Sequence, residues 1–211
     1  GIWPAAWVAA ERVIALCASR RRGSTAPPLR ILEIGCGSGL PSLCALAAGG
    51  DVLATDLEEL PLRLLEAAAR SQSLRGHLET REVDVLAAVG QSRVAGGLVR
   101  HAGSACPSDS EHFDAIVCSD CLYKLDVAAA IGRLLARALL RWPTTTVVVT
   151  DANRRGRQAF LDSLAKGLGL GIGESSLPVF EDTRVPPWAN GALDPFDGTL
   201  TGEVGLLRLY Q

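Results

Sequence analysis

The chain contains no methionine, few aromatic residues and no long uncharged hydrophobic run. Its 211 residues begin with glycine, and aromatic types make up 5% of them although hydrophobic types reach 48%. No run approaches the roughly 18 apolar residues that a membrane-spanning helix needs, and no basic region precedes the first apolar segment as in a signal peptide. We therefore expect no membrane span, no signal peptide and a natural N-terminus upstream of Gly1.

Neither sign of charge is in large excess. The chain has 21 basic and 23 acidic residues, giving a formal net charge of −2. Nucleic-acid-binding domains usually carry a strong basic excess, so the composition argues against a nucleic-acid partner while leaving a local basic patch open. A chain of this size buries roughly 70% of its extended surface on folding. We therefore expect one domain over 1–211, acting as a monomer, that needs no disulfide or metal for its core.

The six cysteines do not form a metal-ligand pattern. Cys118 and Cys121 have CxxC spacing, but no second pair and no suitable histidine accompanies them. A structural zinc site needs four ligands, and a reactive thiol needs surroundings that stabilise its thiolate. We predict structural free thiols and no bound metal. Free thiols indicate a reducing compartment, which favours a cytoplasmic protein and leaves the nucleus or an organelle open.

Apolar periodicity alternates between strand and helix along the chain. The helix predicted over 3–17 has one apolar face, formed by Trp3, Trp7, Ala10, Ile14 and Cys17. A polar connector is expected over 19–28. Further helices are predicted at 40–48, 61–70, 127–141 and 156–168, and strands at 29–34, 52–55, 79–85, 113–119, 144–150, about 174–180 and about 203–210. This alternation predicts an α/β fold with a doubly wound, mostly parallel sheet, an antiparallel pair at its edge and a long insertion over 88–112.

The sharpest motif is the segment EIGCGSG at the end of the first predicted strand. Gly35, Gly37 and Gly39 alternate with other residues, which lets the backbone turn tightly and lets a ligand approach the main chain beside Cys36. The next helix directs its N-terminal N–H groups at the same place. The spacing is not the GxGxxG of dinucleotide sites, and Glu33 favours a ligand with a cationic amine over one with a pyrophosphate.

Two acidic residues follow the next predicted strands. Asp56 ends the second strand, where an acid typically binds the two hydroxyls of an adenosine ribose. An exposed loop acid or a helix cap is the alternative. Asp84 is predicted at the end of the third strand, where its carboxylate could accept a hydrogen bond from an adenine amino group while Val85 packs on the ring. A solvated loop acid is the alternative there.

These motifs resemble class I S-adenosylmethionine-dependent methyltransferases. The similarity covers roughly 1–155 through EIGCGSG, TD, VDV and FDAIVCSDCLY. More narrowly, the N-terminal GIWPAA and the Asp120-Cys121-Leu122-Tyr123 segment are similar to motifs of the seven-strand lysine methyltransferases grouped with nicotinamide N-methyltransferase (methyltransferase family 16). The resemblance implies a Rossmann-like sheet of order 3-2-1-4-5-7-6 and S-adenosyl-L-methionine as the cofactor. It also implies further cofactor contacts at Trp3, Leu57 and Ser119.

By the same resemblance, Asp120 and Tyr123 are the expected catalytic residues. A helix-capping or loop acid is the alternative for Asp120, and a packed core or rim aromatic is the alternative for Tyr123. Methyl transfer requires a lone pair placed in line behind an already activated methyl carbon, which is mainly a matter of positioning. A lysine amine, with a pKa of ~10.4, is almost entirely protonated at pH 7. A carboxylate at Asp120 would attract and align the ammonium, and apolar walls near Tyr123 would favour loss of its proton to water.

The sequence thus predicts an N-methyltransferase acting on a lysine side chain of a protein. Methylation of a small-molecule amine is the alternative within enzymes. A non-catalytic methyltransferase-like subunit that binds a partner is the alternative outside them, although the intact glycine turn argues against it. An NAD-binding Rossmann protein is disfavoured because GxGxxG is absent. The acceptor depends on segments 151–157 and 181–202, whose sequence does not define it.

Overall fold

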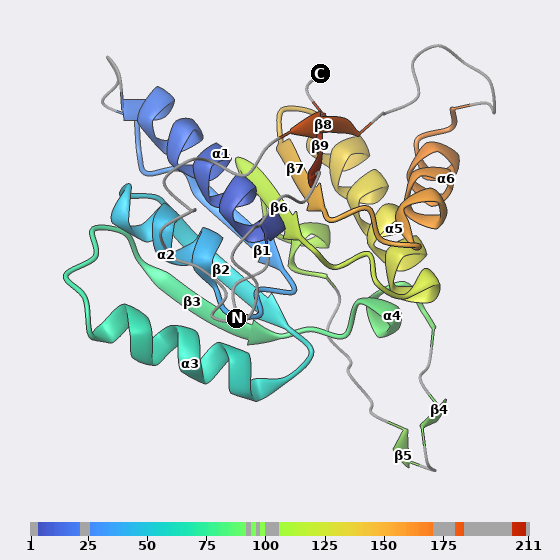
Figure 1. Cartoon of the computed structure of the whole chain (residues 1–211), viewed down its shortest axis with the longest axis horizontal. Coiled ribbons are helices and arrows are strands. Elements are labelled where there is room, and N and C mark those ends of the chain that lie inside the picture. The colour runs from blue at the N-terminus through green and yellow to red at the C-terminus, as the bar shows by residue number, and fades with distance from the viewer. Residues whose placement is uncertain are drawn as a thin grey trace.

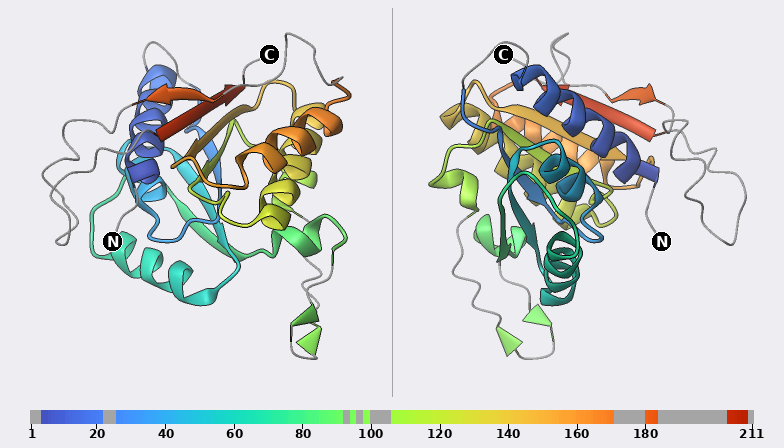
Figure 2. Two further views of the ribbon diagram at one scale, coloured as in Figure 1. Left: turned by 45° about the vertical axis from the view of Figure 1, so that its right-hand side comes forward. Right: turned by 90° about the vertical axis from the view of Figure 1, so that its left-hand side faces the viewer.

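The protein is described here by a computed structural model. It describes residues 4–21, 26–91, 106–170 and 180–183, together with the backbone of three short strand segments at 94–95, 98–99 and 204–209. A central sheet has helices on both faces (Figures 1 and 2). The helices are α1 (Pro4–Arg21), α2 (Leu40–Ala47), α3 (Glu59–Arg70), α4 (Val85–Ala88), the 3-10 helix η1 (Pro107–Asp109), α5 (Leu125–Arg141) and α6 (Arg157–Gly167).

The strands of the central sheet are β1 (Arg30–Ile34), β2 (Asp51–Asp56), β3 (Leu78–Glu82), β6 (Ala115–Ser119), β7 (Thr146–Asp151), β8 (Glu181–Thr183) and β9 (Val204–Leu209). Five of them are parallel neighbours in the order β3-β2-β1-β6-β7, which confirms the predicted order of the first five strands. At the edge beyond β7, β9 pairs antiparallel with β7 and β8 pairs antiparallel with β9. Within the insertion, β4 (Val94–Ala95) and β5 (Leu98–Val99) form a separate antiparallel pair.

Strands buried on both faces explain the short apolar runs of the sequence. In β7, Val147, Val148 and Val149 are all buried although their side chains alternate between faces. One face is covered by α1, α2 and α3, and the other by α4, α5 and α6 (Figure 1). The two hydrophobic layers fix the carboxyl ends of the parallel strands at one edge of the sheet, which is where such sheets bind ligands.

The first helix differs from its predicted form. It continues to Arg21, because basic residues in the last turn suit the negative end of the helix dipole. Val13 is buried, whereas Ile14, expected on the apolar face, is 39% exposed. The predicted stripe assumed a single contact face, but α1 packs against α2 as well as against β6 and β7. Trp3 lies outside the described residues.

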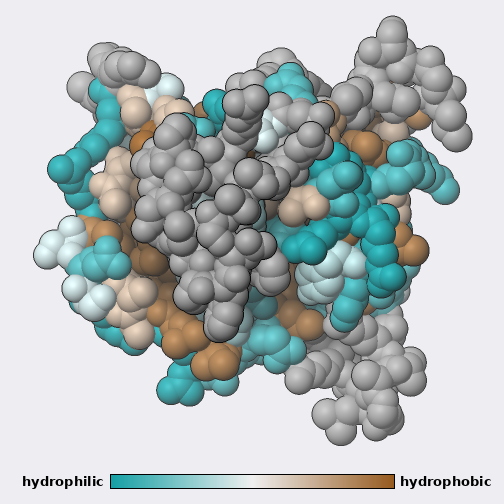
Figure 3. Space-filling view, in the orientation of Figure 1, coloured by the Kyte–Doolittle hydropathy of each residue, from teal (hydrophilic) through white to brown (hydrophobic). Residues whose placement is uncertain are grey.

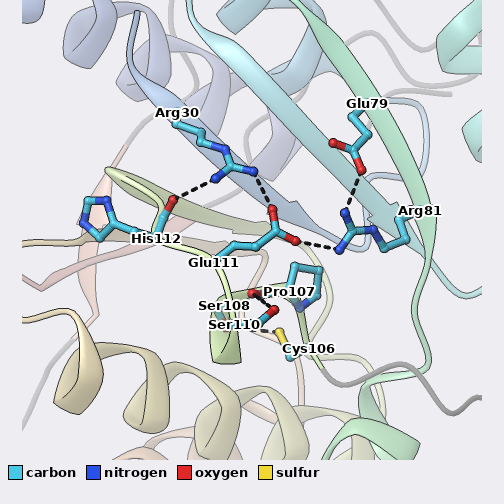
Figure 4. A network of polar contacts seen from close by, with 9 residues as sticks. All are labelled: Arg30, Glu79, Arg81, Cys106, Pro107, Ser108, Ser110, Glu111 and His112. Carbon is cyan, nitrogen blue, oxygen red and sulfur yellow. Dashed lines mark hydrogen bonds and ion pairs between the residues drawn. The ribbon is translucent and has the colours of Figure 1, made fainter. Parts of the chain in front are cut away.

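A network of ion pairs holds the segment that follows the insertion (Figure 4). The Glu111 carboxylate accepts hydrogen bonds from Arg30 in β1 and, at 2.8 Å, from Arg81 in β3. Arg81 also donates to Glu79 at 2.6 Å, and Arg30 lies over the ring of Phe113. Hydrogen bonds from Arg81 lower the pKa of Glu111. Each pair is partly exposed and contributes little alone, but together they anchor the start of β6.

The described surface includes some exposed hydrophobic side chains. In α3, Leu60 and Leu64 are exposed one helical turn apart. Figure 3 shows hydrophobic residues along the lower edge of the molecule, where Figure 1 places α3. None of the described helices is long and apolar enough to cross a membrane.

Candidate functional site

A cavity of about 230 Å³ opens at the carboxyl ends of β1, β2 and β6. It brings together most of the residues that the sequence singled out for cofactor binding and catalysis. These are Glu33, Gly35, Cys36, Gly37, Asp56, Leu57, Asp84, Val85, Ser119, Asp120 and Tyr123. Gly39 shapes the turn without lining the cavity, and Trp3 lies outside the described residues. Residues from separate parts of the chain therefore converge on one site, as the predicted parallel sheet requires.

The glycine turn needs its three glycines for different reasons. Gly35, Gly37 and Gly39 all have positive φ angles, of 68°, 49° and 71°. A Cβ atom at Gly35 would lie 2.6 Å from the Cys121 sulfur, and one at Gly39 would lie 2.6 Å from a methyl carbon of Leu65. A Cβ at Gly37 would meet nothing within 4 Å. Gly37 therefore borders open space inside the cavity, where a ligand can approach the backbone.

Asp56 holds the turn in place from the neighbouring strand. Its Oδ2 accepts a hydrogen bond from the backbone N–H of Gly37 at 2.9 Å, and its Oδ1 accepts one from Glu58 at 3.2 Å. The N–H of Cys36 donates to the carbonyl of Thr55 at 2.8 Å. A carboxylate has about four acceptor positions, so Asp56 keeps capacity for further donors. Asp56 therefore both closes the turn and lines the cavity.

Glu33 carries a buried carboxylate with an unsatisfied oxygen. Its Oε2 accepts from the backbone N–H of Ser42 at 3.1 Å and from the Ser42 hydroxyl, in the first turn of α2. Its Oε1 is buried and has no hydrogen-bond partner among the described residues. Burial raises the pKa of Glu33 to about 7, against the opposing effect of Ser42. Glu33 lines the cavity, so a cationic donor placed there would satisfy the unpaired oxygen.

Asp84 differs from its predicted place at the end of a strand. The strand β3 ends at Glu82, and Asp84 instead forms the N-cap of the short helix α4. Its Oδ1 accepts from the N–H of Leu86 at 2.9 Å, which satisfies a backbone donor at the helix start. The side chain is buried and lines the cavity next to Val85. The structure thus places Asp84 at the site, in the geometry of the helix cap.

The Cys121 thiol packs against the glycine turn. Its sulfur lies 3.4 Å from the Ile34 carbonyl oxygen and 3.2 Å from that of Ser119. A hydrogen bond with Cys118, together with burial, raises the pKa of the Cys121 thiol. Neither cysteine is in a disulfide. Among the described residues, no group of three or more His, Cys, Asp or Glu side chains is placed to hold a metal ion.

On the other side of the cavity, Asp120 is paired with an arginine that the sequence did not single out. Asp120 follows β6 with a φ of 54°, and its side chain is 6% exposed. Arg154 donates to both carboxylate oxygens, from Nε at 3.0 Å and from a terminal nitrogen at 2.7 Å. These hydrogen bonds raise the pKa of Arg154 above its usual range. Asp120 reaches the cavity as predicted, but as half of an ion pair.

Hydrogen bonds within the segment 151–157 fix the position of Arg154. Asp151 is fully buried, and its Oδ2 accepts from the backbone N–H of Arg154 and from Arg157 Nε, each at 2.9 Å. Burial raises the pKa of Asp151. The N–H of Gly156 donates to the carbonyl oxygen of Leu122 at 3.1 Å. A Cβ atom added at Gly156 would lie only 2.3 Å from the same oxygen. The three arginines after β7 were the one sequence signal that could have indicated this support.

Tyr123 lines the cavity and remains 52% exposed. The backbone carbonyl of Tyr123 accepts from Arg155 Nε at 3.3 Å, and Leu125 beyond it is also exposed. The ammonium nitrogen of Lys124 lies 5.8 Å from the centre of the Tyr123 ring. This distance is within the range of a cation–π contact. This side of the cavity thus has a carboxylate, an aromatic ring and access from solvent.

Comparison with known families identifies one match. The profile of the family described as "Methyltransferase domain" matches residues 32–141, just over half of the chain. The matched region begins in β1 and ends with α5, so it includes the glycine turn and Asp120. No curated protein matches the chain.

Several solved structures share the fold. A TehB-like SAM-dependent methyltransferase from Corynebacterium glutamicum has a TM-score of 0.53 and 16% identity, covering 96% of this chain and 87% of its own. Magnesium protoporphyrin IX methyltransferase from Synechocystis with bound SAH has a TM-score of 0.52 and 13% identity, and the match covers 95% of this chain and 83% of the Synechocystis chain. A methyltransferase structure from Thermoplasma acidophilum has a TM-score of 0.53 and 17% identity, and the match covers 93% of this chain and 74% of the Thermoplasma chain.

Proposed function

We propose that this chain, which belongs to the methyltransferase domain family, methylates the amine of a protein lysine side chain. Its cofactor is S-adenosyl-L-methionine. The observation that carries the acceptor assignment is that Asp120 and Tyr123 both line the cavity and that Tyr123 is half exposed to solvent. The similarity of Asp120-Cys121-Leu122-Tyr123 to the D-x-x-Y motif of lysine methyltransferases supports the same assignment.

The residues of the cavity fit S-adenosyl-L-methionine. The unpaired Oε1 of Glu33 is suited to accept from the ammonium of the methionine part, and Asp56 from the ribose hydroxyls. The open space beside Gly37 would admit the cofactor against the backbone, and Val85 would pack on the adenine next to Asp84. When bound, the cofactor supplies a methyl group already activated on a sulfonium.

The residues of the acceptor side can orient and deprotonate an amine. Arg154 donates two hydrogen bonds to Asp120 and the backbone N–H of Ala152 a long one at 3.5 Å, so of its about four acceptor positions the carboxylate retains one for an incoming ammonium. Because Arg154 also compensates much of the carboxylate charge, the ammonium form is not held too strongly, and its proton can pass to water. The Tyr123 ring would pack on the aliphatic part of the side chain and limit the access of water to the amine.

A small-molecule amine is the second candidate acceptor. Magnesium protoporphyrin IX methyltransferase, which covers 95% of this chain, acts by its name on a small molecule. The two candidates predict different entrances, because a small amine needs an enclosing pocket whereas a protein side chain needs an open rim. The exposure of Tyr123 and Leu125 favours the protein acceptor.

The test is incubation of the chain with S-adenosyl-L-methionine labelled in its methyl group and a lysate deficient in methylation. Mass spectrometry then identifies the labelled products and the modified atom. We expect label on lysine side chains of one or a few proteins. A Gly37→Val chain, in which the valine would occupy the cofactor space, is the control and should give none. Label confined to small amines would support the second candidate, and label on oxygen or carbon would contradict both.

A further inference from the structure

Lys124 places an amine of this chain itself beside the ring of Tyr123, a residue that lines the cavity. The chain has only two lysines, Lys124 and Lys166. Lys124 directly follows Tyr123, and its ammonium nitrogen lies 5.8 Å from the centre of the ring that lines the cavity. Lys166, by contrast, lies in the last turn of α6. One of the two lysines is therefore adjacent to the site where an acceptor amine is expected.

The backbone around Lys124 is fixed, whereas its side chain is exposed. The carbonyl of Lys124 accepts from Ala128 at the start of α5. The preceding residues are tied to the segment after β7 by the hydrogen bonds from Gly156 to Leu122 and from Arg155 to Tyr123. Exposed side chains change rotamer within nanoseconds. The Lys124 amine can therefore change its position relative to the Tyr123 ring by rotation of its side chain alone.

We propose that Lys124 is a site of self-methylation within a single chain. This inference rests on the proposed function, because it uses the same cavity and an amine acceptor. In the step, the Lys124 ammonium first loses a proton to water. Its nitrogen lone pair then forms a bond to the methyl carbon, the bond from that carbon to sulfur breaks, and the electron pair stays on sulfur to give S-adenosylhomocysteine.

A tethered amine has two advantages over an amine in solution. Its attachment next to Tyr123 replaces a bimolecular encounter with an intramolecular one, which raises its effective concentration at the cavity. Its nitrogen also lies within cation–π range of the Tyr123 ring, the aromatic face proposed for an acceptor side chain. A protein acceptor that packs on the Tyr123 ring, as proposed above, would compete with Lys124 for it, so the modified and unmodified chains should also differ in their apparent KM for an external acceptor.

The experiment incubates the purified chain with S-adenosyl-L-methionine carrying a deuterated methyl group, with no other acceptor, and maps the label by peptide mass spectrometry. We expect the label on Lys124. Lys124→Arg keeps the charge and should lose all of this label, whereas the matched variant Lys166→Arg should retain it. The rate constant should not change when the protein is diluted, because the step occurs within one chain.

Three outcomes would overturn the proposal: label on Lys166 instead, no label on a chain shown by calorimetry to be saturated with cofactor, or a rate constant that falls on dilution. The proposed function fails separately. A chain that methylates lysines of lysate proteins but not Lys124 contradicts only self-methylation. A chain that labels only oxygen or carbon atoms contradicts the amine acceptor itself.

Discussion

Arg154 donates two hydrogen bonds to Asp120 across the end of the sheet, linking the loop after β7 to the loop after β6. The Asp120 side chain is 6% exposed and that of Arg154 is 34% exposed. Removing one partner of a buried pair is costly because the other charge is left without compensation. The pair therefore fixes a carboxylate at the cavity that would otherwise be unfavourable in so buried a position.

We expect Arg154→Gln to lower the free energy of unfolding by about 1–3 kcal/mol. This is less than the cost for a fully buried pair, because solvent screens the partly exposed guanidinium. Denaturant titration measures the change. Arg155→Gln is the matched control, since Arg155 is exposed and donates only to the Tyr123 carbonyl in the described contacts; it should change stability by less than about 0.5 kcal/mol. Equal losses in both variants would contradict the role given to the pair.

Glu33 should make stability depend on pH. Its folded pKa is raised from 4.5 to about 7, so the folded state holds a proton that the unfolded state has released between these values. Stability should therefore fall as pH rises from 4.5 to about 7, by up to about 3 kcal/mol. Unfolding titrations at several pH values measure this slope. Glu33→Gln should remove it, and an unchanged slope in that variant would assign the proton to another group.

The same carboxyl should also control cofactor affinity. A cationic ammonium binds best to ionised Glu33, so affinity for S-adenosyl-L-methionine should weaken by up to about tenfold for each pH unit below about 7. Calorimetric titrations from pH 5.5 to 7.5 measure this dependence. Glu33→Gln should bind more weakly at pH 7.5 and lose most of the pH dependence. Affinity independent of pH in the unmodified chain would contradict the contact between Glu33 and the ammonium.

Substitution of Gly37 tests whether cofactor binding is lost because the cavity is filled or because the backbone is strained. Gly37→Val should abolish cofactor binding, because the branched side chain would fill the open space at the turn. Gly169→Val is the matched control. Gly169 also has a positive φ, of 74°, and its added Cβ would meet nothing within 4 Å, but it does not line the cavity. Both should lose about 1–2 kcal/mol of stability from the strained backbone, and only Gly37→Val should lose binding. Loss of binding in both would indicate a general effect of strain.

The sequence was sufficient to predict the parallel core and the glycine turn, because these follow from local patterns. Buried parallel strands appear as short apolar runs, and EIGCGSG marks the turn between a strand and a helix. The sequence was less informative about positions where several helices and strands pack together. Val13 is buried and Ile14 is exposed because α1 contacts α2, β6 and β7 and not the single surface that the predicted stripe assumed. Asp84 caps a four-residue helix that begins three residues after the end of β3, too close for the apolar pattern to separate the two elements.

The pairing of Asp120 with Arg154 could not be predicted for a different reason. The two residues are 34 positions apart and meet only because β6 and β7 are neighbours in the sheet. Neither periodicity nor spacing indicates which of the three arginines in 151–157 pairs with Asp120. The choice is made by the buried carboxylate of Asp151, which binds the backbone of Arg154 and the side chain of Arg157.

The acceptor role of Asp120 is tested most directly by Asp120→Asn, which keeps the shape of the side chain and removes its charge. Single-turnover methyl transfer to the acceptor identified from the lysate is measured alongside affinity for S-adenosyl-L-methionine. We expect the rate to fall by roughly 10²–10³, as for loss of one preorganised electrostatic group, while cofactor affinity changes by less than about threefold. A parallel loss of rate and cofactor affinity in Asp120→Asn protein that circular dichroism shows to be folded would place Asp120 in the cofactor site and contradict its role toward the acceptor amine.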